Sequence, residues 1–228
     1  MKLLLTAFFF MLFINSYGQE SVDFSQPNYE NIEKEISKKR SDFYYPKLME
    51  KFQKGDSTMT IDEKRHLYYG FQFQDGYNPY ARSTYKDSLQ TVLKEANPTK
   101  EDMKDIIRFG DLILAENPFE LRTINYQLYA YEHLQMEEAF HQKLQMFRSI
   151  IDAIFSSGNG LTEETAYYVI YVAHEYIILE INEYTFEGQS LIHHKYDYME
   201  ISENPDEVKG LYFDVSASLN SMSKMFEN

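Results

Sequence analysis

The sequence predicts a mainly α-helical fold, in which stacked antiparallel helical hairpins are followed by a small three-stranded antiparallel β-meander and a final helix. Three observations predict it. Apolar residues between Thr99 and Glu180 recur at spacings of three and four, the period of amphipathic helices. The breaks between these runs are short, and short connections join antiparallel neighbours. Beyond Glu180 the pattern changes to short segments typical of strands.

The first two helices of this region meet at Asn117-Pro118. Thr99 can cap the first helix, which ends at Asn117 because the residue before a proline is driven out of the α region. Gly110 lies on the buried face. Since glycine inside a helix costs about 1 kcal/mol relative to alanine, we expect another helix to pass close to it. The apolar positions of the two helices are Met103, Ile106, Ile107, Ile113 and Leu114, then Leu121, Ile124, Leu128 and Tyr131.

The next two helices are separated by the segment SSGNG at 156–160, which ends the third helix. Thr162, followed by Glu163 and Glu164, is expected to start the fourth, because acidic side chains stabilise the positive end of a helix dipole. We expect the fourth helix to continue to about Glu180. The apolar positions are Met136, Phe140, Phe147, Ile150, Ala153 and Ile154 in the third helix, and Ala166, Val169, Ile170, Ala173, Tyr176 and Ile177 in the fourth.

Asn117-Pro118 and the segment LQMEEA at 134–139 resemble a degenerate tetratricopeptide repeat. In that repeat an N-P ends one unit, and a small residue in the second helix lets the pair pack closely. The usual tryptophan and the interhelix glycine are missing, and Thr123 and Leu134 stand near their places. The resemblance therefore favours a stack of α-hairpins and does not indicate peptide binding.

Residues 1–18 have the pattern of a signal peptide: Lys2 precedes an apolar run at 3–14, and SYG at 16–18 has small residues at its first and third positions. A membrane anchor is disfavoured, because a span needs about 20 apolar residues and this run is much shorter. No cysteine follows, which excludes a lipoprotein anchor. We expect a mature chain that begins at Gln19, has no membrane span, and acts in the periplasm or outside the cell.

The mature chain is expected to form one globular domain at 28–228 after a flexible polar linker at 19–27. The absence of cysteine excludes disulfides, thiol nucleophiles and thiolate metal sites. Removing Lys2 from the 22 basic residues leaves 21 against 36 acidic ones, a net charge of −15. Such a surface favours solubility and repels phosphate backbones, so we expect no nucleic-acid partner. A protein or peptide partner in the cell envelope is compatible with it, and the oligomeric state stays open.

Helices are also expected before Thr99. The same periodicity predicts short helices around 32–36 and from 46 to 55. Thr60 and Glu63 form a capping box, in which a hydroxyl and a carboxylate three residues apart satisfy free N–H groups reciprocally. A helix should therefore run from Ile61 to about Gly70.

An aromatic loop follows that helix: seven of the twenty residues at 66–85 are Tyr or Phe. In a functional interpretation Tyr69, Tyr77 and Tyr80 are stacking surfaces for a sugar or peptide, and Arg82 supplies a charge. In the alternative interpretation the rings fill the space under a long loop and their hydroxyls bond to the backbone. These four residues are the candidate binding residues of the sequence.

Three segments resemble an uncharacterised family of small exported proteins from Bacteroidetes, the domain of unknown function 4919. They are the tyrosine-rich segment 66–80, GQSL at 188–191 and GLYF at 210–213. The resemblance covers roughly Phe43 to Phe226. It implies export across the inner membrane and a mostly helical domain. It implies no activity, so no catalytic residue is carried over.

The C-terminal part is rich in Tyr, Phe, Ile and Val and predicts an antiparallel β-meander over residues 182–215. A final helix from Ser216 to Phe226 should pack back on it. Because three strands are unstable without a covered face, we expect the sheet to lean on the helices. The expected strands are 182–187, 191–201 and 210–215, with turns at 187–189 and 202–206.

No catalytic or metal-binding motif is complete. His174-Glu175 begins like a metalloprotease helix, but Ile178 stands where the second histidine belongs, so we expect His174 to border the helix core. His193 and His194 are neighbours in a predicted strand, so they point to opposite faces and cannot chelate one ion alone. There is no G-x-S-x-G elbow, phosphate-binding glycine loop or G-x-G-x-x-G. We expect no metal site and no cofactor.

Three functions remain open. The first is a non-catalytic binding or scaffold protein of the cell envelope, which the helical stack and the lack of a catalytic motif favour. The second is a small-ligand or glycan binder that uses the aromatic loop. The third is a hydrolase built from distant Asp and Glu residues, which predicts a deep cleft with two carboxylates about 5 to 9.5 Å apart.

Overall fold

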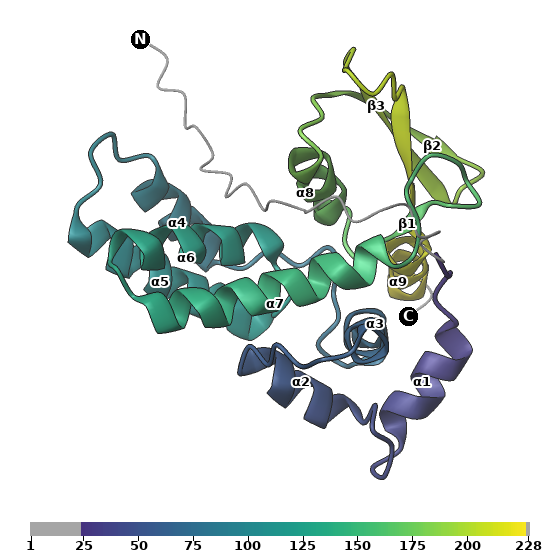
Figure 1. Ribbon diagram of the computed structural model, residues 1–228, viewed down its shortest axis with the longest axis horizontal. Helices are drawn as coiled ribbons and strands as arrows, with labels where there is room; N and C mark the ends of the chain where they lie inside the picture. The colour runs from purple at the N-terminus through teal and green to yellow at the C-terminus, as the bar shows by residue number, and fades with distance from the viewer. Residues whose placement is uncertain (1–23, 227–228) are drawn as a thin grey trace.

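The computed structural model describes residues 24–226, and side chains up to residue 223. The expected signal peptide at 1–18 and residues 19–23 of the expected linker lie outside the described residues. Figure 1 labels the helices α1 to α9 and the strands β1, β2 and β3. In chain order they are α1 (Tyr29–Ser37), α2 (Tyr45–Gln53), α3 (Ile61–Gly70), η1 (Phe71–Phe73), α4 (Tyr85–Leu93), α5 (Lys100–Glu116), α6 (Leu121–His133), α7 (Glu137–Phe155), β1 (Tyr167–Tyr168), α8 (Ala173–Ile181), β2 (Phe186–Ile192), β3 (Tyr196–Ile201), β4 (Gly210–Asp214) and α9 (Ser216–Phe226).

The helices α4, α5, α6 and α7 pack in sequence order, each against the next, and this confirms a mainly α-helical fold with stacked hairpins. The long helix α7 lies at the centre of Figure 1, with α6 on one side and α2 and α3 on the other. A methyl group on Gly110 of α5 would lie 2.5 Å from the side chain of Gln127 in α6. The close approach predicted at this glycine is therefore confirmed.

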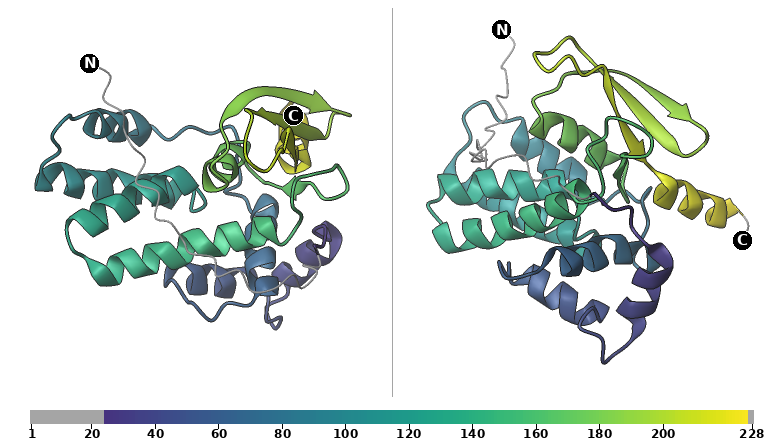
Figure 2. Two further views of the ribbon diagram at one scale, coloured as in Figure 1. Left: turned by 45° about the horizontal axis from the view of Figure 1, so that its top comes forward. Right: turned by 45° about the vertical axis from the view of Figure 1, so that its right-hand side comes forward.

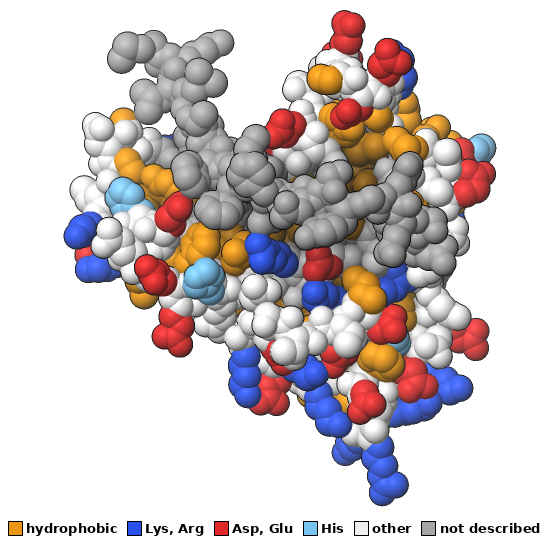
Figure 3. Space-filling view, in the orientation of Figure 1, with side chains coloured by type: hydrophobic (Ala, Val, Ile, Leu, Met, Phe, Trp, Pro, Cys, Tyr) orange, Lys and Arg blue, Asp and Glu red, His pale blue; other side chains and the backbone are white. Residues whose placement is uncertain are grey.

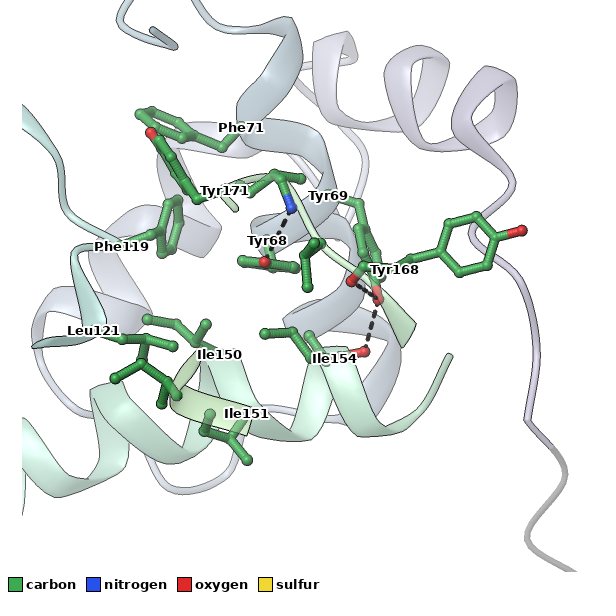
Figure 4. Close-up of a cluster of buried hydrophobic side chains, with 14 of the residues drawn as sticks. Tyr68, Tyr69, Phe71, Phe119, Leu121, Ile150, Ile151, Ile154, Tyr168 and Tyr171 are labelled. Carbon is green, nitrogen blue, oxygen red and sulfur yellow. Dashed lines mark hydrogen bonds between the residues drawn. The ribbon is translucent and has the colours of Figure 1, made fainter. Parts of the chain in front are cut away.

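Both predicted N-terminal caps are present. The hydroxyl of Thr60 accepts a hydrogen bond from the N–H of Glu63, and the N–H of Thr60 donates to the carboxylate of Glu63. Thr99 and Asp102 form the same pair of bonds. The helix that Thr60 begins, α3, runs from Ile61 to Gly70 as predicted and lies almost wholly inside the molecule. Figure 4 shows its Tyr68 and Tyr69 against the apolar side chains of α7. The core therefore lies where α3 and α7 meet.

The fourth predicted helix is wrong over its first half. Residues 161–172 are not helical, and only α8, from Ala173 to Ile181, matches the prediction. Thr162 and Thr165 bond each other's backbone N–H groups through their hydroxyls, which holds a turn instead of a helix start. Residues 166–171 are all buried, which one face of a helix cannot provide. The apolar residues in this segment are spaced as in a helix, but they are apolar because the whole segment is buried and not because one helix face is.

Within residues 24–226 the sheet has four strands, and it is not the simple antiparallel meander that was predicted. Strands β2, β3 and β4 are antiparallel neighbours, but β1 joins the far side of β4 in parallel. The buried hydroxyl of Ser157 accepts the N–H of Tyr168 at 2.9 Å, which fixes β1 beside the end of α7. The nonhelical segment therefore supplies the fourth strand.

The first hairpin turn is also misplaced in the prediction. The expected turn at 187–189 lies inside β2, where the strand carries a bulge between Phe186 and Gly188. The chain instead turns at 193–195, with both His193 and His194 at positive φ. These two histidines are exposed turn residues, so the prediction that they lie in a strand and face opposite sides is wrong.

The final helix α9 has the predicted bounds, Ser216 to Phe226, whereas the sequence interpretation missed α4. Figure 2 shows the β2–β3 hairpin standing out from the helical body on the same side as α9. The carbonyl of Ser25 accepts a hydrogen bond from Arg65 at 2.7 Å, so the described end of the N-terminal segment is attached to α3. Within residues 24–226 no helix is long and apolar enough to cross a membrane.

Candidate functional site

The four candidate residues of the aromatic loop do not share one surface. Tyr69 is fully buried in α3 and donates its hydroxyl proton to the carbonyl of Ala153 at 2.9 Å. Figure 4 shows that hydroxyl pointing into the core. Arg82 is exposed and forms an ion pair with Asp87 on the same stretch of chain. Tyr77, Tyr80 and Arg82 lie in the loop between η1 and α4, and Tyr69 does not.

Tyr77 and Tyr80 fasten this loop to the rest of the molecule. The hydroxyl of Tyr77 donates to the carbonyl of Ile170 at 2.6 Å, and that of Tyr80 donates to the carbonyl of Ser218 at 3.2 Å. The Tyr77 ring packs edge-on against Phe71 and Tyr171. Tyr80 keeps 43% of its surface exposed. Of the predicted binding rings, Tyr80 alone offers a large free face.

A small polar cavity of about 40 Å³ lies under this loop. Lys86 and Glu120 form an ion pair of 2.9 Å on its wall, and Asn78 and Asn117 also line it. Tyr171, which is only 6% exposed, also lines it. The cavity therefore has polar side chains on its wall and room for water-sized guests.

A buried polar chain links α3, α8 and the segment between α5 and α6. Nε2 of His174 lies 2.9 Å from the carbonyl oxygen of Phe119, which can only accept, so Nε2 carries the proton. Nδ1 then accepts from the hydroxyl of Tyr68 at 2.7 Å, and this hydroxyl accepts the N–H of Ile170 at 3.1 Å. Burial lowers the pKa of His174 to about 4. Its imidazole is therefore neutral near pH 7 and has a structural role.

The outer edge of the sheet is open to another chain within the described structure. In the strand order β1-β4-β3-β2, β2 is the last strand, so no described strand pairs with its outer edge. Phe186 and Leu191 of β2 expose 40% and 51% of their surfaces. An unpaired strand edge presents free N–H and C=O groups to another chain. This edge, with its two partly exposed apolar side chains, is a candidate binding surface.

Residues 30–224 match the model of the family described as domain of unknown function (DUF4919). The chain belongs to this family. No curated protein and no solved structure matches it. Membership in the DUF4919 family confirms the resemblance that was based on segments 66–80, 188–191 and 210–213.

In this DUF4919 domain, residues 24–223 contain no group of three or more His, Asp or Glu side chains that could hold a metal ion. The second hollow, between α2 and α7, is shallow and is lined by Gly55 and His141 among others. The first cavity is small, although Glu116 and Glu120 both line it, and the second is shallow, so neither is the deep cleft that the hydrolase hypothesis predicts.

Sequence interpretation missed one further pair of residues in the DUF4919 domain. Glu175 of α8 and Asp197 of β3 are buried together beneath the hairpin. Glu175 was seen only as part of an incomplete zinc motif. No pattern of neighbouring residues could have predicted this pair, because Asp197 reaches α8 only through the pairing of β3 with β2 and β4.

Proposed function

We propose that this protein is a non-catalytic binding protein that takes up an extended segment of a partner protein along the free edge of β2. The unpaired edge of β2 carries the proposal. Added strands of this kind gain affinity from main-chain hydrogen bonds and specificity from contacts with alternate side chains. Phe186 and Leu191 supply such apolar contacts beside the edge.

The charge around the edge supports a basic partner segment. Glu187 lies in β2, Glu200 is exposed on β3, and the loop between β3 and β4 adds Glu203, Asp206 and Glu207. Figure 3 shows acidic side chains around an apolar patch at the sheet end of the molecule. The chain as a whole has a net charge of −14. A partner strand with alternating apolar and Lys or Arg side chains would match this surface.

The edge is protected against unspecific pairing. The bulge between Phe186 and Gly188 interrupts the regular ladder, and it places the charged Glu187 at the interruption. Bulges and charges are the usual means of preventing edge-to-edge aggregation. The regular part of the edge, Gly188 to Ile192, is therefore short and suits a short partner segment.

A pair of proline variants tests the proposal. In an antiparallel edge strand, neighbouring residues direct their N–H groups alternately to the partner strand and outward. Of Ser190 and Leu191, one therefore donates to β3 and the other faces solvent. Ser190→Pro and Leu191→Pro should differ in stability, and the variant that stays folded should lose the partner, because its outward N–H is gone. Leu191→Ala controls for the lost apolar side chain.

The readout combines capture and hydrogen exchange. The purified chain captures partners from an envelope extract, and each captured protein is then mixed with it to measure amide exchange. A true partner should slow exchange in β2 and fail to bind the folded proline variant. The proposal is wrong if captured proteins leave β2 exchange unchanged or if they bind the folded proline variant as well as the native chain.

We also propose that the protein acts outside the cytoplasm, in the cell envelope. The support is the signal-peptide pattern at 1–18. Expression in a bacterial host followed by fractionation and N-terminal sequencing tests it. A chain that begins at Gln19 in the periplasmic or external fraction is expected. A cytoplasmic chain that retains Met1 contradicts the proposal.

The second candidate function is binding of a small polar ligand at the aromatic loop. The observation that favours it is the cavity lined by Tyr171, Asn78 and Asn117, which is roofed by the loop that Tyr77 and Tyr80 fasten. Tyr80→Ala and Arg82→Ala should leave the fold intact, since both side chains are exposed, and should reduce ligand-induced thermal stabilisation in a metabolite screen. If Tyr77→Ala and Tyr80→Ala unfold the protein, the loop is structural and this candidate loses its basis.

A further inference from the structure

Two carboxyl groups meet in the interface between the β2–β3 hairpin and α8. Glu175, on α8, is completely enclosed, and Asp197, on β3, is 7% exposed. No N–H or O–H donor of the described chain reaches either carboxyl oxygen of Glu175. Its hydrogen-bonding neighbour is the carboxyl of Asp197. Two carboxyl groups in contact need a proton between them, since neither is a donor when ionised.

Asp197 is tied to the hairpin by neutral groups. The amide nitrogen of Gln189, on β2, donates to Asp197 at 2.6 Å. The amide oxygen of Gln189 in turn accepts the hydroxyl of Tyr176, on α8, at 3.3 Å. These two bonds complete a polar connection from helix to hairpin and back. None of them brings a positive charge.

The other titratable groups that face the pair are tyrosines. Tyr176 from α8 and Tyr80 from the aromatic loop interact electrostatically with it, and both stay neutral near pH 7 because the pKa of each is raised. Within the described residues no Lys, Arg or His acts on either carboxyl. Lys195, in the hairpin turn before β3, lies 3.1 Å from Asp214. A second negative charge in this interface would therefore have no cation beside it.

Burial then decides the charge of the pair. It raises the pKa of Glu175 well above its usual range, and Asp197 raises it further. Burial also raises the pKa of Asp197, although the bonds from Gln189 and Glu175 oppose this. The closed interface therefore holds one proton, on Glu175, which donates to the Asp197 carboxylate. Ionising Glu175 as well would place two like charges in contact away from water.

We propose that Glu175 and Asp197 form a proton-operated latch, which holds the β2–β3 hairpin on α8 while one proton is shared and releases the hairpin when that proton is lost. On release the O–H···O bond breaks, the proton passes to solvent, and water enters to hydrate both carboxylates. The closed form binds one proton more than the open form. The ratio of closed to open forms therefore falls as pH rises, by up to about tenfold per pH unit above the pKa of an exposed Glu.

Hydrogen exchange on the full chain tests the latch. After correction for intrinsic rates, amide protection in β2 and β3 should fall by up to about tenfold per unit between pH 5 and pH 8, while α5 and α6 stay constant. Glu175→Gln should abolish this slope, because an amide donates to Asp197 without titrating. Glu180→Gln is the matched control, since Glu180 lies on the same helix but is exposed and paired with Arg122. It should keep the slope.

A slope that persists in Glu175→Gln, or native protection in β2 and β3 that does not change with pH, would overturn the latch. If Glu175→Gln does not fold, carboxyl carbon NMR of the native chain decides instead. One buried carboxyl should then titrate in the pH range where the hairpin opens, and a normal titration of both carboxyls would exclude the latch.

The latch does not rest on the proposed partner binding, and the two can fail separately. Proline at the outward position of β2 tests binding and leaves the carboxyl pair in place. Glu175→Gln changes only the pH dependence of hairpin exchange. If both proposals hold, capture of the partner should vary with pH in the native chain and become independent of pH in Glu175→Gln.

Discussion

The side-chain amide of Gln127 in α6 occupies the space that a side chain at position 110 of α5 would need. A methyl group on Gly110 would lie 2.5 Å from its nitrogen. Gln127 is fully buried, and that nitrogen donates to the carbonyl of Ile107 at 2.9 Å and to Asp111 at 2.8 Å. The glycine therefore makes room for a polar bridge between two helices.

Gly110→Ala should destabilise the protein by about 1 to 3 kcal/mol. The gain in helix propensity of about 1 kcal/mol is smaller than the loss of the two hydrogen bonds of Gln127, which stays buried without them. Urea denaturation measures the difference. Gly76→Ala is the control, since nothing lies within 4 Å of its added methyl group and it should have almost no effect. A more stable Gly110→Ala protein would contradict the close approach of α5 and α6.

Because of His174, the free energy of unfolding should decrease in mild acid. The pKa of its buried imidazole is lowered to about 4, whereas an exposed histidine titrates near 6.5. As pH falls from about 6.5 to 4, the unfolded chain takes up a proton that the folded chain does not, so the folded state loses up to about 3 kcal/mol. The measurement is the difference in the free energy of unfolding between the native chain and His174→Gln. This difference should decrease as the pH is lowered from 7 to 4. An equal pH dependence in both proteins would refute it.

Thr60→Ala should lower stability by about 1 kcal/mol. The hydroxyl of Thr60 accepts the N–H of Glu63 at 3.2 Å, and the carboxylate of Glu63 accepts the N–H of Thr60 at 2.8 Å. Loss of a capping hydroxyl leaves an N–H of α3 without its partner. Thermal unfolding measures the change. Thr84→Ala, at the start of α4, is matched because Thr84 makes no capping bond, and it should have little effect.

Lys195→Met should destabilise the protein by about 3 to 5 kcal/mol, because it leaves the carboxylate of Asp214 buried without a cation. Asp214 is 1% exposed, and Lys195 lies 3.1 Å from it. Adding Asp214→Asn should recover much of the loss in a double-mutant cycle. Lys54→Met serves as control, since Lys54 pairs with Glu50 at the surface and such pairs contribute about 0 to 1 kcal/mol. Equal losses of stability in the two lysine variants would show that Lys195 stabilises Asp214 no more than a surface ion pair does.

Local signals predicted the helices well. The capping box at Thr60, the cap at Thr99 and the N-P break at Asn117 each depend on residues a few positions apart, and each marks a helix boundary of the structure. The missed helix α4 shows the limit of this approach. Of its residues only Leu89 is buried, so its sequence has a weak apolar face.

The candidate site was predicted less well. The tyrosine-rich loop was found from composition, but composition does not say which hydroxyl meets which carbonyl. The structure places Tyr69 in the core and uses Tyr77 and Tyr80 to fasten the loop. The binding role of these residues and of Arg82 stays a prediction. The free edge of β2 could not be found at all, because an edge is defined by the strand that is missing beside it.

The sequence by itself determined that the chain is mainly helical and where most helices begin and end, because caps, breaks and periodicity act within a few residues. It also determined the family, through the segments 66–80, 188–191 and 210–213. Only the tertiary structure decided that residues 161–172 are not helical and include the buried strand β1, that the hairpin turns at 193–195, and that Glu175 meets Asp197. In each of these the outcome depends on partners that are distant in the chain. Pairing with β4 holds Tyr167 and Tyr168 in the sheet, and burial between two elements makes a shared proton necessary. A local sequence pattern records neither.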